Sequence, residues 1–208
     1  MYARTTTLIA DPARIDDGIA DVRDDVMPAV LEMDGCTGIS MLCDRGSGRC
    51  IVTTAWQTDD AMAASRDRVM AMRQRAADAF GARAPDVQEW EIAAMHRLHA
   101  PGDDACARVT WTRLADAAEA DRMTDAFRHD ILPRLDEIPG FCSVSLLVDR
   151  NAGLSSLTAV YADRSALDAS TSRARAMREE FTGRQAMEVL DLADFDVALH
   201  HLRVPELV

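Results

Sequence analysis

The chain has 208 residues, of which 35 are Asp or Glu and 23 are Lys or Arg, giving a net charge of −12. It contains no run of basic residues, so a nucleic-acid partner is excluded, because phosphate binding needs clustered cations. No apolar stretch is long enough to span a bilayer, and the start lacks a charged segment followed by an apolar run. Five cysteines occur without metal-ligand spacing. We therefore expect a cytoplasmic protein with reduced thiols and no membrane partner.

The first half of the chain predicts the order strand, helix, strand, strand, helix, strand. Residues 2–9 are rich in β-branched residues, and Asp11-Pro12 is a helix start whose apolar stripe runs to Gly35. A hairpin follows over 36–56, turning at Arg45-Gly46-Ser47-Gly48, and a second helix follows over 59–80. Residues 81–85 break that helix, and 87–96 predict the last strand. This β-α-β-β-α-β order is that of a ferredoxin-like domain.

The same pattern occurs a second time. GCTGISMLCDRGSGRCIVTTAW, from Gly35, aligns without a gap with GFCSVSLLVDRNAGLSSLTAVY, from Gly140, at a constant offset of 105. In the second copy we expect strands at 106–114 and 192–202 and a helix over 164–182. The offset pairs Thr6 with Trp111 and His96 with His201. The chain is therefore predicted to be a duplication, with one repeat at 1–98, a linker at 99–105 and a second repeat at 106–208.

Duplication has a consequence for the sheets. Helices cover one face of a ferredoxin-like sheet, and the bare face needs a partner. We predict an α+β fold in which two tandem ferredoxin-like units form an intramolecular dimeric α/β-barrel, with a ligand pocket inside it. Small polar side chains on the face opposite Met41 and Val144 would line this pocket; they are Ser40, Ser145, Thr53 and Thr158. The alternative is that these residues are simply inherited from the ancestral repeat.

Two motifs resemble a known family. TTAWQTDDAMAAS and TAVYADRSALDAS, with the preceding PAVLEMDGCTGISML and PRLDEIPGFCSVSLL, resemble antibiotic-biosynthesis-monooxygenase (ABM) domains of the dimeric α/β-barrel superfamily. The resemblance covers nearly the whole chain twice. It implies a monooxygenase acting on a small aromatic or quinol-like substrate without metal or flavin.

Other members of that family open haem with an Asn on the first strand and a Trp and a His on the second helix. Here the one asparagine, Asn151, lies in a turn, and neither second helix (59–80 or 164–182) contains Trp or His. Haem degradation by that route is therefore not expected. Haem remains an alternative as a bound ligand only, and no cofactor is otherwise predicted.

His96 and His201 are the candidate general bases, since histidine titrates near neutrality. They could also serve as axial haem ligands. The alternative is a histidine hydrogen-bonded at the end of a strand. Trp111 is the candidate stacking residue for an aromatic ligand, or else it fills one pocket. Trp56 and Trp90 are expected to pack in the core, and Cys43 and Cys50 to face each other across the hairpin as free thiols.

The first functional hypothesis is thus an ABM-type monooxygenase, with His96 or His201 as base and Trp111 against the substrate. The second is a non-catalytic protein that binds an apolar ligand in the barrel, and the third a structural or regulatory module. A homodimer of the fused unit is compatible with each of them.

Overall fold

A computed structural model describes residues 1–82 and 85–208, and the chain divides into two compact units. Unit 1 consists of Met1–Trp90 and Phe195–Val204, and unit 2 of Glu91–Asp194 and Pro205–Val208. Each unit therefore combines most of one sequence repeat with a short piece of the other. Of the predicted helix break at 81–85, residues 83 and 84 lie outside the described residues.

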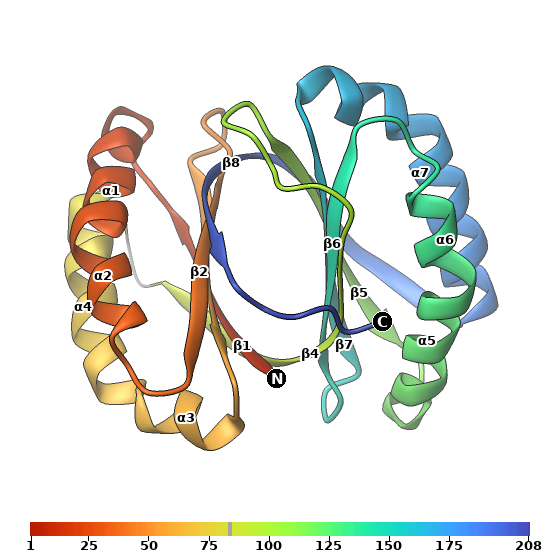
Figure 1. The fold of residues 1–208 in the computed structure, drawn as a ribbon, viewed down its shortest axis with the longest axis horizontal. Coiled ribbons are helices and arrows are strands. Elements are labelled where there is room, and N and C mark those ends of the chain that lie inside the picture. Colours follow the sequence, from red (N-terminus) through yellow and green to blue (C-terminus); the bar gives the residue numbers. More distant parts are fainter. Residues whose placement is uncertain (83–84) are drawn as a thin grey trace. The chain divides into compact units, whose positions relative to one another are not determined.

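The first repeat forms the elements that its sequence predicts (Figure 1). They are β1 (Tyr2–Ile9), η1 (Pro12–Arg14), α1 (Ile15–Asp21), η2 (Val22–Val26), α2 (Met27–Leu31), β2 (Cys36–Cys43), β3 (Arg49–Trp56), α3 (Asp59–Ala64), α4 (Arg66–Ala79) and β4 (Asp86–Arg97). Asp11 caps the first helical turn by accepting from the Ala13 N–H, and Thr58 caps α3 in the same way. Gly35 turns the chain into β2 with φ +76°.

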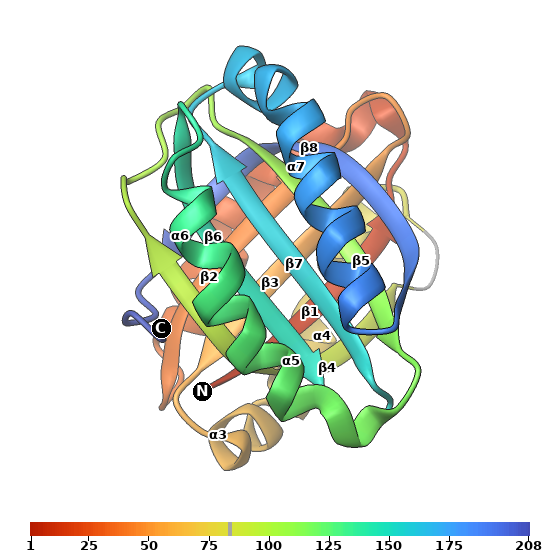
Figure 2. The ribbon, with the colours of Figure 1, turned by 90° about the vertical axis from the view of Figure 1, so that its right-hand side faces the viewer.

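The second repeat gives the same series. Its elements are β5 (Cys106–Leu114), η3 (Ala117–Glu119), α5 (Ala120–Ala126), η4 (Phe127–Ile131), α6 (Leu132–Leu135), β6 (Phe141–Asp149), β7 (Leu154–Tyr161), α7 (Arg164–Arg184) and β8 (Met187–Leu202). Figure 2 shows α5, α6 and α7 lying across the face of β5, β7 and β6. The last strand begins five residues before its predicted start, at Met187.

In each repeat the helical segment after the first strand contains a π-helical turn that the sequence pattern does not reveal. The turns η2 and η4 occupy equivalent places, and each is followed by a proline, Pro28 or Pro133. Proline has no N–H to give to the carbonyl four residues before it, and its ring collides with that carbonyl. Widening the helix by one residue relieves the collision, and the Met27 N–H bonds to the Val22 carbonyl instead.

The two long strands β4 and β8 belong to both units. The C-terminal part of β4 pairs antiparallel with β6 in unit 2, and the C-terminal part of β8 pairs with β2 in unit 1. With these strands the hydrogen-bonded order β1-β3-β2-β8-β5-β7-β6-β4 closes on itself. The predicted fold class, α+β with two ferredoxin-like units in the strand order of a dimeric α/β-barrel, is confirmed.

One predicted equivalence between the repeats is wrong. In the ladders Thr7 lies opposite Ile51, and Trp111 lies opposite Ser156, the repeat equivalent of Ile51. Trp111 therefore corresponds to Thr7 and not to Thr6. The offset is 104 along β1 and β5 and 105 elsewhere, because the second copy has one extra residue between its first strand and its first helix.

The hydrophobic core of each unit lies between its sheet and its helices. In unit 1 the strand residues Ile39, Met41 and Cys43 pack against Ile15 and Val22 of the first helix. In unit 2 the largest cluster joins β6 and β7 to α5, η4, α6 and α7. Cys43 lies directly opposite Cys50, as predicted, and both are buried free thiols.

Candidate functional site

Unit 2 has a cavity of about 90 Å³ between its sheet and its helices. One wall is apolar and comes from the first helix and the strands β6 and β7. The opposite wall, made by β5, α7 and both ends of β7, carries the polar groups. The lining residues of the apolar wall include Met123, Phe127, Ile131, Leu135, Leu146 and Leu157. The polar groups of the opposite wall come from Arg108, Thr110, Thr112, Ser155, Tyr161, Arg178 and Thr182, among which α7 also places Met177 and Phe181. The cavity is therefore polar on one side only.

Arg108 is the anchor of the polar wall. It lies on β5, and its guanidinium forms a two-pronged contact with Asp194, Nε to Oδ1 at 2.7 Å and Nη2 to Oδ2 at 2.8 Å. Nη1 donates to Thr171 Oγ1 on α7 at 3.3 Å. The hydrogen bond to Asp194 raises the pKa of Arg108, against the effect of burial. The Arg108–Asp194 pair is neutral as a whole, and its two hydrogen bonds hold the guanidinium of Arg108 in one orientation at the cavity wall.

Arg178, on α7, contributes a second guanidinium to the same wall. Its side chain is half-buried and forms no hydrogen bond or ion pair with any residue in the described part of the chain. Burial lowers the pKa of Arg178, and the charge of Arg108 lowers it further. An arginine remains charged under such shifts, so Arg178 brings a positive charge to the cavity wall.

The hydroxyl groups of the wall are arranged along β5 and β7. Thr112 and Ser155 lie opposite each other in the ladder, and their oxygens are 2.6 Å apart. One hydroxyl hydrogen is used in that bond and the other is left for a further acceptor. Thr110, two residues before Thr112, points the same way and is 6% exposed. The wall can thus donate hydrogen bonds to an oxygen-containing ligand.

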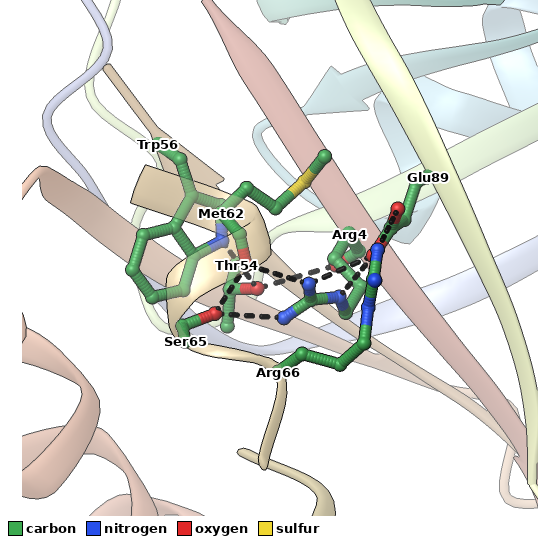
Figure 3. A network of polar contacts seen from close by, with 7 residues as sticks. All are labelled: Arg4, Thr54, Trp56, Met62, Ser65, Arg66 and Glu89. Atoms are coloured by element: carbon green, nitrogen blue, oxygen red, sulfur yellow. Dashed lines mark hydrogen bonds and ion pairs between the residues drawn. The ribbon is translucent and has the colours of Figure 1, made fainter. Parts of the chain in front are cut away.

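Unit 1 contains a counterpart of the Arg108 anchor, shown in Figure 3. Arg4 on β1 is 2% exposed and donates to Glu89 on β4 from Nε at 2.9 Å and from Nη2 at 2.8 Å. Its Nη1 donates to Ser65 Oγ at 2.9 Å, and Nη2 also reaches the Met62 carbonyl at 2.7 Å. Burial alone would raise the pKa of Glu89, but the contacts with Arg4 and Arg66 outweigh it and lower the pKa.

The cavity of unit 1 is smaller, about 40 Å³, because larger side chains close it. Phe80 lies over Gly18, where an added Cβ would be 2.2 Å from the phenyl ring. Val69 takes the place that Ala174 has in unit 2. Leu8 and Cys50 replace the hydroxyl pair Thr112 and Ser155. Arg73, the equivalent of Arg178, also lines this cavity, and its buried Nε has no partner among the described residues.

The two predicted histidines lie outside both cavities. His96 is held between two carboxylates, with Nε2 2.9 Å from Asp136 Oδ1 and Nδ1 3.1 Å from Glu206 Oε2. Burial would lower the pKa of His96, but the two acidic partners raise it above its ordinary value. His201 pairs with Ile39 in the β2–β8 ladder and is half-buried. The His96 ring nitrogens are thus occupied, as in the hydrogen-bonded strand-end alternative.

The predicted ligand-binding residues lie on the face of each sheet away from the helices. Ser40 is opposite Thr53 in unit 1, and Ser145 is opposite Thr158 in unit 2. Trp111 is on the same face as Thr158, since Val109, two residues before it, pairs with Thr158. The structure therefore brings the predicted serines and threonines together in pairs. In unit 2, His96 and the cavity lie on the other face of the sheet, the face that the helices cover.

Sequence reasoning missed the arginines. Arg4 and Arg108 are 104 residues apart, so a repeat comparison at offset 105 aligns Arg4 with Val109 and hides the match. The available signal was an arginine at a core-facing position of an otherwise β-branched strand, together with an acidic residue, Glu89 or Asp194, at equivalent places in the last strands.

The described residues limit the chemistry. Neither cavity is lined by a histidine or a carboxylate of residues 1–82 or 85–208. Within the same residues, no group of three His, Cys, Asp or Glu side chains could hold a metal ion. No helix in the described part of the chain is long and apolar enough to cross a membrane.

Two proteins of Mycobacterium tuberculosis strain H37Rv are close relatives. Rv2557 is 46% identical over 208 residues, which span all of this chain and 92% of the relative. Rv2558 is 45% identical over 209 residues, spanning all of this chain and 88% of the relative. This chain belongs to their family. No family model matches the chain.

Solved structures share the fold at low sequence identity. An anthrone oxidase-like protein has TM-score 0.65 and 14% identity, covering 96% of this chain and 92% of that one. A ferredoxin-fold protein from Listeria monocytogenes, related to antibiotic biosynthesis monooxygenases, has TM-score 0.53 and 7% identity, with 94% of each chain covered. The haem-degrading enzyme LmHde from the same species has TM-score 0.54 and 9% identity, covering 94% and 99%. The predicted resemblance to ABM domains is thus confirmed for the fold.

Proposed function

We propose that the protein is an ABM-type monooxygenase that oxidises a small aromatic or quinol-like substrate in the cavity of unit 2, without a metal or a flavin. The observation that carries this proposal is the one-sided polarity of that cavity, which suits a flat apolar ring with an acidic hydroxyl group. The fold shared with an anthrone oxidase-like protein supports the reaction class.

The reaction needs no external reductant. For a phenol, one oxygen atom of O₂ becomes a new ring carbonyl, and the other leaves as water with two hydrogens from the substrate. Resorcinol and O₂ thus give hydroxyquinone and water. The step begins from the phenolate, and the charge of Arg178 in a partly dry cavity lowers the pKa of a bound phenol. Thr110 and Thr112 are placed to orient the oxygen of the substrate.

Cavity size limits the substrate. An engineered protein cavity of about 150 Å³ binds one benzene molecule. The cavity of unit 2, about 90 Å³, is smaller, so a single ring already requires some adjustment of its walls. Met123, Met177 and Met187 line it, and the flexible methionine side chain can move to admit a ligand. A haem macrocycle is far too large, and haem is therefore not part of this proposal.

Oxygen consumption with resorcinol tests the proposal, and mass spectrometry under ¹⁸O₂ should find one labelled atom in the quinone. Ala174→Phe places a ring inside the unit 2 cavity and should reduce turnover at least about tenfold, because the substrate is excluded. The matched change in unit 1, Val69→Phe, should leave turnover within about twofold of wild type. Loss of activity in both variants, or in neither, would contradict the assignment to unit 2.

A specific observation favours a second function, that of a non-catalytic binding protein. Among the described residues that line the cavity, no side chain has an ordinary pKa suited to accept a proton at neutral pH. In that case resorcinol would bind to the wild type and not to Ala174→Phe, and no oxygen would be consumed. The free thiols, of which all but Cys36 are buried, agree with the cytoplasmic location that we propose for either function.

A further inference from the structure

The Arg178 side chain forms no hydrogen bond or ion pair within residues 1–82 and 85–208, although the neighbouring charge of Glu179 favours its charged form. Two carboxylates near the cavity are engaged by other arginines: Asp194 by Arg108, and Glu179, the next residue along α7, by Arg175 at 2.7 Å. The positive charge of Arg108 also acts on Arg178 and lowers its pKa, which disfavours the charged form of Arg178. A half-buried cation beside a like charge is retained at a cost in stability, so a binding role is the natural explanation.

The position of this charge relative to the apolar wall is defined by the sheet. In unit 2 the strand order is β5-β7-β6, and α7 contacts β5 and β7. Arg178 on α7 and Thr110 on β5 are therefore on one side of the cavity. Leu146 on β6 and Leu135 on α6 are on the other. A ligand that fills this space has its charged end and its apolar end on opposite sides.

We propose that the ligand of unit 2 is a small aromatic acid, whose carboxylate binds Arg178 while its ring lies against the apolar wall. This inference rests on the proposed function, since it names the substrate class for the same cavity. The charge of the wall calls for an anion, because Asp194 is engaged by Arg108 and Arg164 while Arg178 lines the cavity without an ion pair among the described residues. The guanidinium fork of Arg178 matches the two oxygens of a carboxylate, and the hydroxyl of Thr110 can donate to one of them.

Unit 1 does not offer the same site. Arg73 supplies an equivalent charge, but Phe80 and Val69 leave a cavity of only about 40 Å³. Leu8 and Cys50 stand in unit 1 where unit 2 has the hydroxyl pair Thr112 and Ser155. We therefore assign one acid-binding site to each chain, in unit 2.

Calorimetric titration with 3,5-dihydroxybenzoate, 3,5-dihydroxybenzamide and inorganic phosphate tests this inference through binding alone. The benzoate and the benzamide have nearly the same shape and differ in charge. The benzoate should bind at least about tenfold more tightly, and Arg178→Gln should weaken it about 10- to 100-fold, because a charge-assisted hydrogen bond is lost. Arg178→Lys, which keeps the positive charge, should keep part of the preference for the benzoate over the benzamide. Arg173→Gln, which removes the same charge from an exposed position of α7 without releasing Glu179, should bind the benzoate as the wild type does.

The outcomes separate this inference from the proposed function. Equal affinity for benzoate and benzamide, or binding of neither, overturns the aromatic-acid assignment, while oxygen uptake with neutral resorcinol still supports the monooxygenase. A benzoate preference that depends on Arg178 without any oxygen uptake supports the acid site and contradicts the monooxygenase. Phosphate that binds as tightly as the benzoate shows a simple anion site and also overturns the assignment.

Discussion

The Arg4–Glu89 pair of unit 1 allows a quantitative prediction of stability. Glu89 accepts from Arg4, whose side chain is 1% exposed, and from Arg66, whose side chain is 62% exposed. Glu89→Ala leaves a buried guanidinium without its counter-charge. Breaking a buried ion pair costs about 3–5 kcal/mol. That figure is reduced here, because Glu89 is itself one-third exposed and Arg4 keeps the oxygens of Ser65 and Met62.

We therefore expect Glu89→Ala to lower the free energy of unfolding by about 2–3 kcal/mol, or the Tm by about 5–10 °C for a chain of this length. Arg66→Ala removes only the exposed partner and should cost less than about 1 kcal/mol. Urea and thermal unfolding of the two variants at pH 7 measure both values. Equal losses for Glu89→Ala and Arg66→Ala would refute the reasoning, since burial of Arg4 would then have no energetic consequence.

Three further predictions concern single residues. The pKa of His96 is raised by its two acidic neighbours, so its contribution to stability is present below the unfolded pKa of about 6.5 and is lost as the pH rises through the folded pKa. His96→Gln should flatten the fall in Tm between about pH 6 and pH 8, and an unchanged pH profile would contradict the ion pairs. Gly18→Ala should cost about 1–3 kcal/mol in urea unfolding, because the added Cβ collides with the ring of Phe80, and a neutral effect would show that this ring moves freely. Gly183→Ala on α7 meets nothing within 4 Å and should raise stability by about 0.5–1 kcal/mol, a gain that circular dichroism melts can detect.

The architecture could be predicted because local signals agree with each other along the chain. Asp11 before Pro12, the turn ending at Gly48 and the capping residue Thr58 each specify a boundary that the structure confirms. The hairpin repeat at offset 105 predicts a duplication, and the hairpin pattern predicts that Ser40 and Thr53 share a sheet face, where the structure pairs them. These features depend on residues close together in the sequence, and such local features can be predicted from hydrophobic periodicity and from the residues that favour turns.

The candidate site could not be predicted in the same way. The sequence places a pocket on the sheet face of Ser145 and Thr158, while the cavity of unit 2 lies on the helix side of that sheet. Its existence depends on side-chain volumes at contacts between distant elements, such as Ala174 in place of Val69. The pairing of Arg108 with Asp194 spans 86 residues and was hidden by the single-residue difference in spacing between the repeats.

The central claim is that a small aromatic ligand occupies the cavity of unit 2, and methyl NMR tests it most directly. With ¹³C-methyl methionine, 3,5-dihydroxybenzoate should shift the signals of Met123, Met177 and Met187, which line the cavity. The methyl signals of Met41 and Met62, in the core of unit 1, should not shift. Shifts confined to the methionines of unit 1, or no shift at a saturating ligand concentration, would contradict the account.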